Sequence, residues 1–370
     1  MLSLNRIRKN PDDIKTGVQS KNESIHLDEI LKTDTHYREK VHELDELRAK
    51  RNKSSDAIAQ AKRDGVNSDK AIAEMRAVSD TIKSIEKEVN DIKNLLDTKL
   101  ELIPNIPHSN VPVGKDESSN VIIREWGEPK NVEYKLKSHV DLGTSLELFD
   151  LERGSKISGS GFPLLTGLGS KLERALINFM LDFHVSEHGY KEIFPPFLTR
   201  PNSPYTCGQL PKFSDDMYYI EKDELYLIPT AEVPLTNLFA DEIIDENNLP
   251  KKYAAYSACF RREAGSYGKD TRGLLRLHQF NKVEMVKFVK PDSSYDELEK
   301  LTQQAEAILQ QLGLHYRVIE LCTGDLSFAA AKCYDLEVWA PGEGKWLEVS
   351  SCSNFEDFQA RRGNIRYRRS

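Results

Sequence analysis

The chain has 370 residues, of which 30% are charged, and its 52 basic and 59 acidic side chains give a net charge of −7. This length allows two or three domains, and the acidic balance excludes a uniformly basic nucleic-acid-binding protein but not a local basic patch. No apolar run approaches the ~20 residues of a membrane span, and the polar N-terminus does not resemble a secretory signal.

The cysteines are scattered and form no CxxC pair. A zinc ribbon and a disulfide framework are therefore disfavoured, and we expect a protein of the reducing cytoplasm that needs no zinc. The five cysteines are Cys207, Cys259, Cys322, Cys333 and Cys352.

The segment from about Leu27 to Ile103 predicts two long helices. It contains no proline, and its single glycine, Gly65, lies in the short stretch KRDGVNSDK. Apolar residues in the second half recur at steps of three and four, which is typical of a coiled-coil seam. Two helices joined by so short a turn must run antiparallel, and with roughly 33 to 37 residues each they would extend about 50 Å.

Basic residues gather in the distal half of this predicted hairpin, where the apolar seam thins. Between residues 48 and 63 there are six basic residues and one acid, Asp56. A solvated helix face would explain such a run, but its place on a long arm favours contact with an extended polyanion. The six are Arg48, Lys50, Arg51, Lys53, Lys62 and Arg63.

Three prolines in the following stretch, Pro104, Pro107 and Pro112, predict a linker over residues 104–120. We therefore expect an N-terminal domain over residues 1–103 and a second domain over residues 121–370. Short strands separated by both tight turns and helices predict an antiparallel-dominated α+β domain there. The chain has no GxGxxG after a strand and no GxxxxGK[ST], so a Rossmann or P-loop nucleotide site is disfavoured.

The stretch FRREAGSYGKDTRGLLRLHQF, which begins at Phe260, predicts a hairpin with a charged face. Strand alternation places Arg261 and Glu263 on one face with Cys259, and His278, Phe280, Lys282 and Glu284 together on the return strand. Leu277, Val283 and Met285 point the other way. Surface ion pairing is one interpretation, but an apolar opposite face indicates a central sheet, whose charges need a partner such as a ligand.

Two further stretches predict polar side chains at strand ends. In LYLIPTAEVPL, Thr230 and Glu232 share a face, and in KWLEVSSCSNF, Glu348 lies near Ser350 and Ser351. A carboxylate with hydroxyl neighbours suits Mg²⁺, although such hydroxyls more often bond to local backbone. Alternation does not separate Ser350 from Ser351.

These stretches resemble the class II aminoacyl-tRNA synthetases, and the seryl-tRNA synthetases most closely. CFRREAGSYGKDTRGLLRLHQFNKVEMVKF is similar to motif 2, PTAEVPL to the TxE segment and EVSSCSNFEDFQARR to the EVSSCSN segment. GSKLERALINFMLDFHVSEHGYKEIFPPF fits motif 1, with Pro195 at its proline, and the helical hairpin matches the tRNA-binding arm. The resemblance covers essentially the whole chain.

The resemblance implies roles for individual residues. Arg261 would contact the α-phosphate of ATP, Glu263 would position the adenosine, and both would be catalytic. The implied ATP-binding residues are Arg261, Arg262, Glu263, Phe280, which stacks on adenine, and Glu348, Val349, Ser350 and Ser351, with Glu348 and Ser351 holding the metal. The implied serine-binding residues are Thr230, Ala231, Glu232, Arg261, Lys282 and Glu284, with Glu284 at the amino group.

The implied activity is that of a serine–tRNA ligase. Such an enzyme activates L-serine with ATP and Mg²⁺ to seryl-adenylate and transfers serine to tRNA(Ser), with tRNA(Sec) as a further candidate. The implied fold is an antiparallel β-sheet catalytic domain with flanking helices, and the implied assembly is a homodimer through the motif 1 helix and strand. The basic residues of the arm would contact the tRNA.

Three alternatives stay open at this point. The chain could be a relative that binds ATP and serine-like ligands without charging tRNA, a coiled-coil scaffold, or a synthetase for threonine or proline. The sequence also departs from the family pattern, because it ends at GNIRYRRS before motif 3. We therefore expect a truncated chain that is impaired in serine activation.

Overall fold

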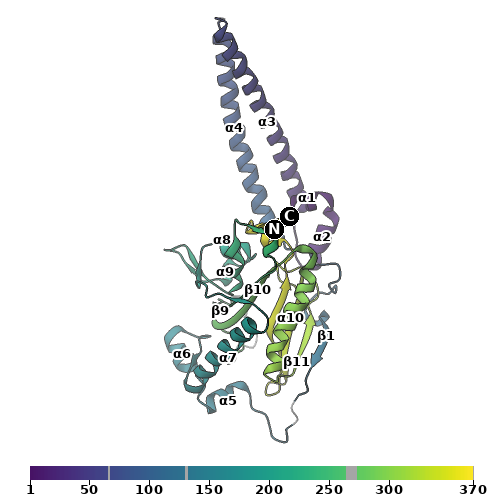
Figure 1. Ribbon diagram of the computed structural model, residues 1–370, viewed down its shortest axis with the longest axis vertical. Helices are drawn as coiled ribbons and strands as arrows, with labels where there is room; N and C mark the ends of the chain where they lie inside the picture. The colour runs from purple at the N-terminus through teal and green to yellow at the C-terminus, as the bar shows by residue number, and fades with distance from the viewer. Residues whose placement is uncertain (66, 130–131, 264–272, 370) are drawn as a thin grey trace. The chain divides into compact units, whose positions relative to one another are not determined.

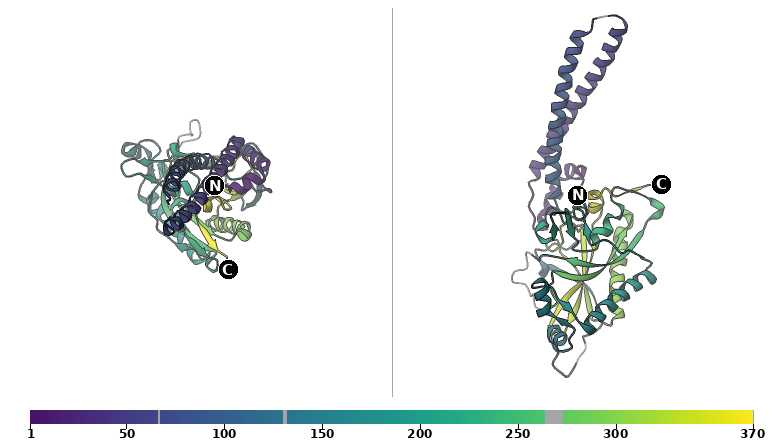
Figure 2. Two further views of the ribbon diagram at one scale, coloured as in Figure 1. Left: turned by 90° about the horizontal axis from the view of Figure 1, so that it is seen from above. Right: turned by 90° about the vertical axis from the view of Figure 1, so that its left-hand side faces the viewer.

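The computed structural model describes residues 1–65, 67–129, 132–263 and 273–369. They form two compact units: an arm unit of residues 2–16 and 24–103, and a sheet unit of Met1, residues 17–23 and the described residues from 104 onward (Figures 1 and 2). Among these described residues, no helix has both the length and the apolarity to cross a membrane.

The arm unit is built on the predicted helical hairpin. Helix α3 (Leu27–Arg63) has 37 residues and α4 (Asp69–Glu101) has 33, and Gly65 between them adopts a left-handed conformation with φ of +68°. The helices run side by side (Figure 2), and the predicted seam buries Leu44, Ile82, Ile85 and Val89. Helices α1 (Leu4–Lys9) and α2 (Pro11–Ser20) precede them, and Arg8 of α1 donates two hydrogen bonds to Asp34 at 2.7 and 2.6 Å.

The sheet unit contains a four-stranded antiparallel sheet in the order β1 (Val121–Trp126), β11 (Tyr316–Glu320), β12 (Lys332–Ala340) and β13 (Lys345–Asn354). Helix α10 (Ser294–Gln311) packs on it (Figure 1). Alternate strand residues such as Val318 and Leu336 are fully buried beneath the helix, against Leu298 and Leu309. The other face of β12 and β13 is thereby left for polar side chains.

A second sheet carries the predicted charged hairpin. Strands β9 (Lys251–Phe260) and β10 (Gln279–Phe288) pair antiparallel over their full length, and β4 (Lys191–Glu192) lies parallel to β9. Helix α7 (Gly167–Ser186) packs on this hairpin, and Val283 and Met285 lie on the packed side as predicted. Strand β4 is short, and the chain leaves it before Pro195 and Pro196.

The remaining elements are short and connect these layers, and the predicted antiparallel-dominated α+β fold is confirmed. The helices are α5 (His139–Ser145), α6 (Leu151–Ser158), α8 (Asn202–Thr206), α9 (Glu232–Thr236) and α11 (Phe358–Arg362), with 3-10 turns at Glu117–Ser119, Ser214–Asp216, Asn237–Phe239, Glu246–Asn248 and Pro291–Ser293. The strands pair as β2 (Phe149–Asp150) with β3 (Leu164–Leu165), β5 (Leu198–Thr199) and β6 (Tyr219–Ile220) with β7 (Leu225–Leu227), and β8 (Ile243–Asp245) with β14 (Arg366–Arg368).

The proline-rich stretch predicted as a linker is packed along the sheet unit. The main-chain N–H groups of Asn105 and His108 donate to the carbonyls of Phe328 and Ala331, both at 2.9 Å. Beside them the buried ammonium of Lys21 donates to four main-chain carbonyls, those of Asn105, Ser327, Phe328 and Ala330, at 2.7 to 3.3 Å. These bonds order a segment whose prolines leave it few donors of its own.

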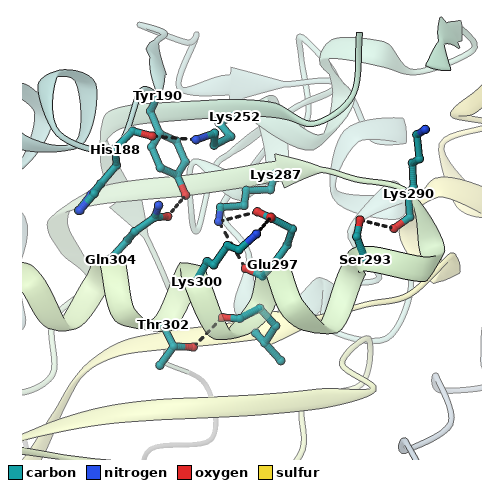
Figure 3. Close-up of polar contacts among 11 residues, drawn as sticks. His188, Tyr190, Lys252, Lys287, Lys290, Ser293, Glu297, Lys300, Thr302 and Gln304 are labelled. Carbon is teal, nitrogen blue, oxygen red and sulfur yellow. Dashed lines mark hydrogen bonds and ion pairs between the residues drawn. The ribbon is translucent and has the colours of Figure 1, made fainter. Parts of the chain in front are cut away.

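A largely buried polar network holds α10 against the β9–β10 hairpin (Figure 3). Lys287 of β10 pairs with Glu297 of α10 at 3.1 Å, and their side chains are 5% and 14% exposed. Burial lowers the pKa of Lys287, which the Glu297 carboxylate opposes. Nearby, Tyr190 donates to Gln304 at 2.7 Å. The pair therefore fixes the helix on the strand at the expense of desolvating two charges.

Glu297 forms one buried and one exposed ion pair, and the contribution of each pair to stability can be measured separately. Glu297 also pairs with Lys300, which is 60% exposed, at 2.6 Å. We expect Glu297→Gln to lower the free energy of unfolding by about 3 kcal/mol, because it leaves the Lys287 ammonium buried without an anion. Lys300→Gln should change it by less than about 1 kcal/mol. Urea unfolding of both variants checks this, and equal losses would contradict it.

Candidate active site

The register of β9 and β10 gathers large polar side chains opposite small ones. Phe280 pairs with Cys259, Lys282 with Ser257, and Glu284 with Ala255. The three residues on β9 are fully buried, whereas the three on β10 are partly accessible. Small neighbours leave space above the strand, so the β10 side chains share one partly accessible face, as alternation predicts.

A hydroxyl, an ammonium and a carboxylate meet at this face. Thr230 donates to Oε2 of Glu284 at 2.6 Å, and Lys282 donates to Oγ1 of Thr230 at 2.7 Å. Lys282 also pairs with Glu284 at 2.6 Å. Burial disfavours the charge of Lys282, but the carboxylate beside it prevails and the pKa of Lys282 is raised. The trio therefore holds opposite charges in fixed positions with a neutral donor between them.

The segment that carries Thr230 is not the strand that the sequence predicts. Strand β7 ends at Leu227, Thr230 lies in a turn, and Glu232 begins helix α9. Pro229 has no N–H to continue a ladder, and Oγ1 of Thr230 instead accepts from the N–H of Glu232 at 3.2 Å. The turn still brings Thr230 to the charged face, and it places Ala231 in the core with no exposed surface.

Glu232 is hydrogen-bonded to a residue that the sequence analysis did not single out. Its Oε1 accepts from the amide of Gln359 on α11 at 2.6 Å. Burial and the neighbouring Glu284 raise the pKa of Glu232 to about 7, while Gln359, Lys282 and Arg261 act in the opposite direction. Gln359 lies in the stretch EVSSCSNFEDFQARR, but an uncharged side chain gives no signal in a search for charged or metal-binding residues.

The arginines at the end of β9 have different neighbours. The guanidinium carbon of Arg261 lies 5.2 Å from the ring centre of Phe280, while that of Arg262 lies 5.7 Å from the ring of Tyr218. The predicted shared face of Arg261 and Glu263 is wrong as strand geometry, because β9 ends at Phe260 and Glu263 has a φ of +53°. Glu263 pairs with Arg276 instead. Residues 264–272 of this motif lie outside the described residues.

A β-bulge on β13 decides which of Ser350 and Ser351 shares a face with Glu348. Ser351 pairs with Asp335, Ser350 with Leu336, and Glu348 with Glu337, so Val349 is the extra residue. In a regular strand Glu348 would share a face with Ser350, but the bulge places it with Ser351. Ser350 faces the buried side with Leu336, and Val349 is 53% exposed.

The polar face of β12 and β13 is rich in carboxylates. Desolvation raises the pKa of Asp335 to about 7, with Glu348 as the next cause. The Glu348 side chain is solvent-exposed, but surrounding protein displaces part of its water and raises its pKa, against the charge of Arg261. Among the described residues no group of three or more His, Cys, Asp or Glu side chains has metal-site geometry. Glu348 and Ser351 supply the hard oxygen donors that Mg²⁺ prefers.

The six predicted arm residues are not equivalent. Arg48 pairs with Glu86 of α4 at 2.8 Å, and Arg51 is half-buried and donates to Asn52 at 3.4 Å. The other four are exposed and have no ion pair within the described part of the arm. These four are Lys50, Lys53, Lys62 and Arg63.

The chain is similar to known proteins over its whole length. The model of the seryl-tRNA synthetase N-terminal domain matches residues 1–107, and that of the tRNA synthetase class II core domain (G, H, P, S and T) matches residues 212–370. A serine–tRNA ligase of Carboxydothermus hydrogenoformans is 53% identical over 368 residues, covering 100% of this chain and 87% of the relative.

Two solved structures have the same fold. Seryl-tRNA synthetase from Pyrococcus horikoshii complexed with ATP superposes with a TM-score of 0.92 at 41% identity, over 100% of this chain and 88% of that one. The cytoplasmic serine–tRNA ligase of Naegleria fowleri in complex with AMP gives 0.88 at 28% identity, over 99% and 88%. The chain therefore belongs to the seryl-tRNA synthetase family, and its activity is that of a class II serine–tRNA ligase.

Proposed function

We propose that the face shared by Thr230, Lys282 and Glu284 binds L-serine and that Arg261 and Phe280 bind ATP next to it. The observation that carries this proposal is the trio of short polar contacts between Thr230, Lys282 and Glu284. An amino acid carries an ammonium and a carboxylate, and Glu284 and Lys282 are matched to these groups. Glu232, the first residue of α9, would complete the serine site, and the buried Ala231 before it would support the site from the core.

The ATP site would lie around the end of β9. Arg261 is exposed and rests against the Phe280 ring, so ATP would replace a cation–π contact by adenine stacking on Phe280 and a phosphate contact to Arg261. Glu263 and Arg262 would flank the nucleotide, as would the segment of Glu348, Val349, Ser350 and Ser351. The ATP complex of the Pyrococcus horikoshii relative supports a nucleotide in this fold.

Glu348 and Ser351 would hold Mg²⁺ together with the phosphates. The fit rests on their oxygen donors, which the bulge places on one face, and on the raised pKa of Glu348, whose partial desolvation disfavours its negative charge until a cation binds. When bound, the ion would neutralise charge on the phosphates.

Adenylation then needs positioning more than proton transfer. The serine carboxylate forms a bond to the α-phosphorus while the bond to the pyrophosphate oxygen breaks, and Arg261 stabilises the developing charge. The terminal hydroxyl of tRNA(Ser), or of tRNA(Sec), then takes the seryl group and AMP leaves. We place this enzyme in the cytoplasm, a proposal that the five free cysteines support.

Two variants that each weaken the binding of one ligand test the proposed site. We expect Glu284→Gln to weaken serine about tenfold or more, because it removes a charge-assisted contact, while MgATP affinity stays within about twofold. Phe280→Ala should weaken MgATP by up to about tenfold and leave serine unchanged. Isothermal titration of each variant with each ligand measures this, and the proposal fails if both variants affect both ligands equally.

We also propose that the exposed basic residues of α3 bind tRNA through its backbone, since side chains cannot read the A-form major groove. Lys50→Ala/Lys53→Ala should weaken tRNA binding and lower the slope of log K against log salt by about 1 to 2. Arg48→Ala is the matched control and should do less, because Arg48 is already paired with Glu86. Filter binding across salt concentrations decides, and an equal or larger effect of Arg48→Ala would contradict the assignment.

A homodimer through α7 and β4 is the third part of the proposal. Leu168 and Leu172, one turn apart on α7, are 70% and 54% exposed, and Phe194 beyond β4 is 76% exposed. Apolar exposure of this extent in one segment favours a protein interface. Sedimentation at micromolar concentration should show a dimer that Leu168→Glu/Leu172→Glu converts to monomer. Val113→Glu, at a residue 85% exposed elsewhere, is the control and should leave the dimer intact.

A further inference from the structure

We infer that Gln359 is a positioning residue for the substrate serine, because its amide fixes one oxygen of Glu232 and leaves the other available to the ligand. This inference rests on the proposal that Glu232 belongs to the serine site. Gln359 is 7% exposed and donates to Oε1 of Glu232 at 2.6 Å and to the carbonyl of Cys207 at 3.5 Å. The side-chain hydrogen bond described for Glu232 uses Oε1, not Oε2.

The helix that carries the amide is anchored at both ends. Helix α11 ends in Arg362, which donates to the carbonyls of Tyr205 and Leu210, both at 2.6 Å. The Arg362 guanidinium lies 4.2 Å from the Tyr205 ring, and Phe358 at the start of α11 is fully buried. Gln359 is therefore fixed to the α8 side of the site and sets the direction of the Glu232 carboxylate.

The contact also affects what Glu232 can do chemically. The groups that face it are Glu284 and Lys282 of β10, Arg261 after β9 and the thiol of Cys207, the residue after α8. Burial and Glu284 favour the protonated acid, whereas the Gln359 amide favours the carboxylate. A carboxylate accepts hydrogen bonds on its free oxygen, so the amide favours the form in which Oε2 can accept from a donor group of serine.

The test compares three single variants of the full chain by isothermal titration with serine and with MgATP. Glu232→Gln tests the proposed site, Gln359→Met removes the donor at similar length, and Arg361→Met, exposed on the same helix, is the control. We expect Gln359→Met to weaken serine about tenfold, leave MgATP within about twofold, and move the pH dependence of serine affinity to higher pH. The control should change neither ligand.

The outcomes separate the two ideas. Unchanged serine affinity in Glu232→Gln would sink the proposed use of Glu232, whereas weaker serine in Glu232→Gln with full affinity in Gln359→Met would overturn only the inference. Equal weakening of serine and MgATP in Gln359→Met, with a lower unfolding temperature, would also overturn it. The exchange variant Glu232→Gln/Gln359→Glu restores the hydrogen bond: weak serine binding there supports positioning, and full recovery indicates a structural role alone.

Discussion

The antiparallel register of β9 and β10 is the constraint on which the site depends. It places Phe280, Lys282 and Glu284 opposite residues no larger than cysteine, while Val283 and Met285 on the other side pack under α7 and α10. A slip of one residue would turn the charged set into the core and the apolar set outward. The buried face thus fixes the register, and the register fixes the site.

The same arrangement keeps charges where water cannot fully solvate them. Glu232 and Asp335 have pKa values of about 7, and the main cause in both is burial. Raised carboxyl pKa values mean that the folded protein binds protons more tightly than the unfolded chain, so the stability that these two groups contribute is lost as the pH rises from about 4 to about 7. A ligand that carries positive charge would offset this loss of stability. A binding site can thus keep buried charges that a packed core would exclude.

On the arm, part of the positive charge seen in the sequence is neutralised by contacts between the two helices. On the arm the seam is continuous where Leu44 meets Ile82 and Ile85, and charge compensation such as that of Arg48 by Glu86 runs between the helices. A charge run in the sequence therefore overstates the free positive charge of the folded arm.

The family match also decides among the alternatives left open by the sequence, because serine–tRNA ligases align with the whole chain and not with one half.

The sequence by itself determined the elements and faces that follow from periodic patterns: the two arm helices, the α+β class, and the shared face of Phe280, Lys282 and Glu284. These are local properties, because side-chain direction repeats every two residues in a strand and every 3.6 in a helix. Tertiary structure alone decided where the period breaks, as at the bulge of Val349, which separates Ser351 from Ser350, and at the positive φ of Glu263. It also decided which distant residues meet, as Gln359 meets Glu232 across 127 positions. Such contacts depend on how whole elements pack, and no repeat within a single segment encodes them.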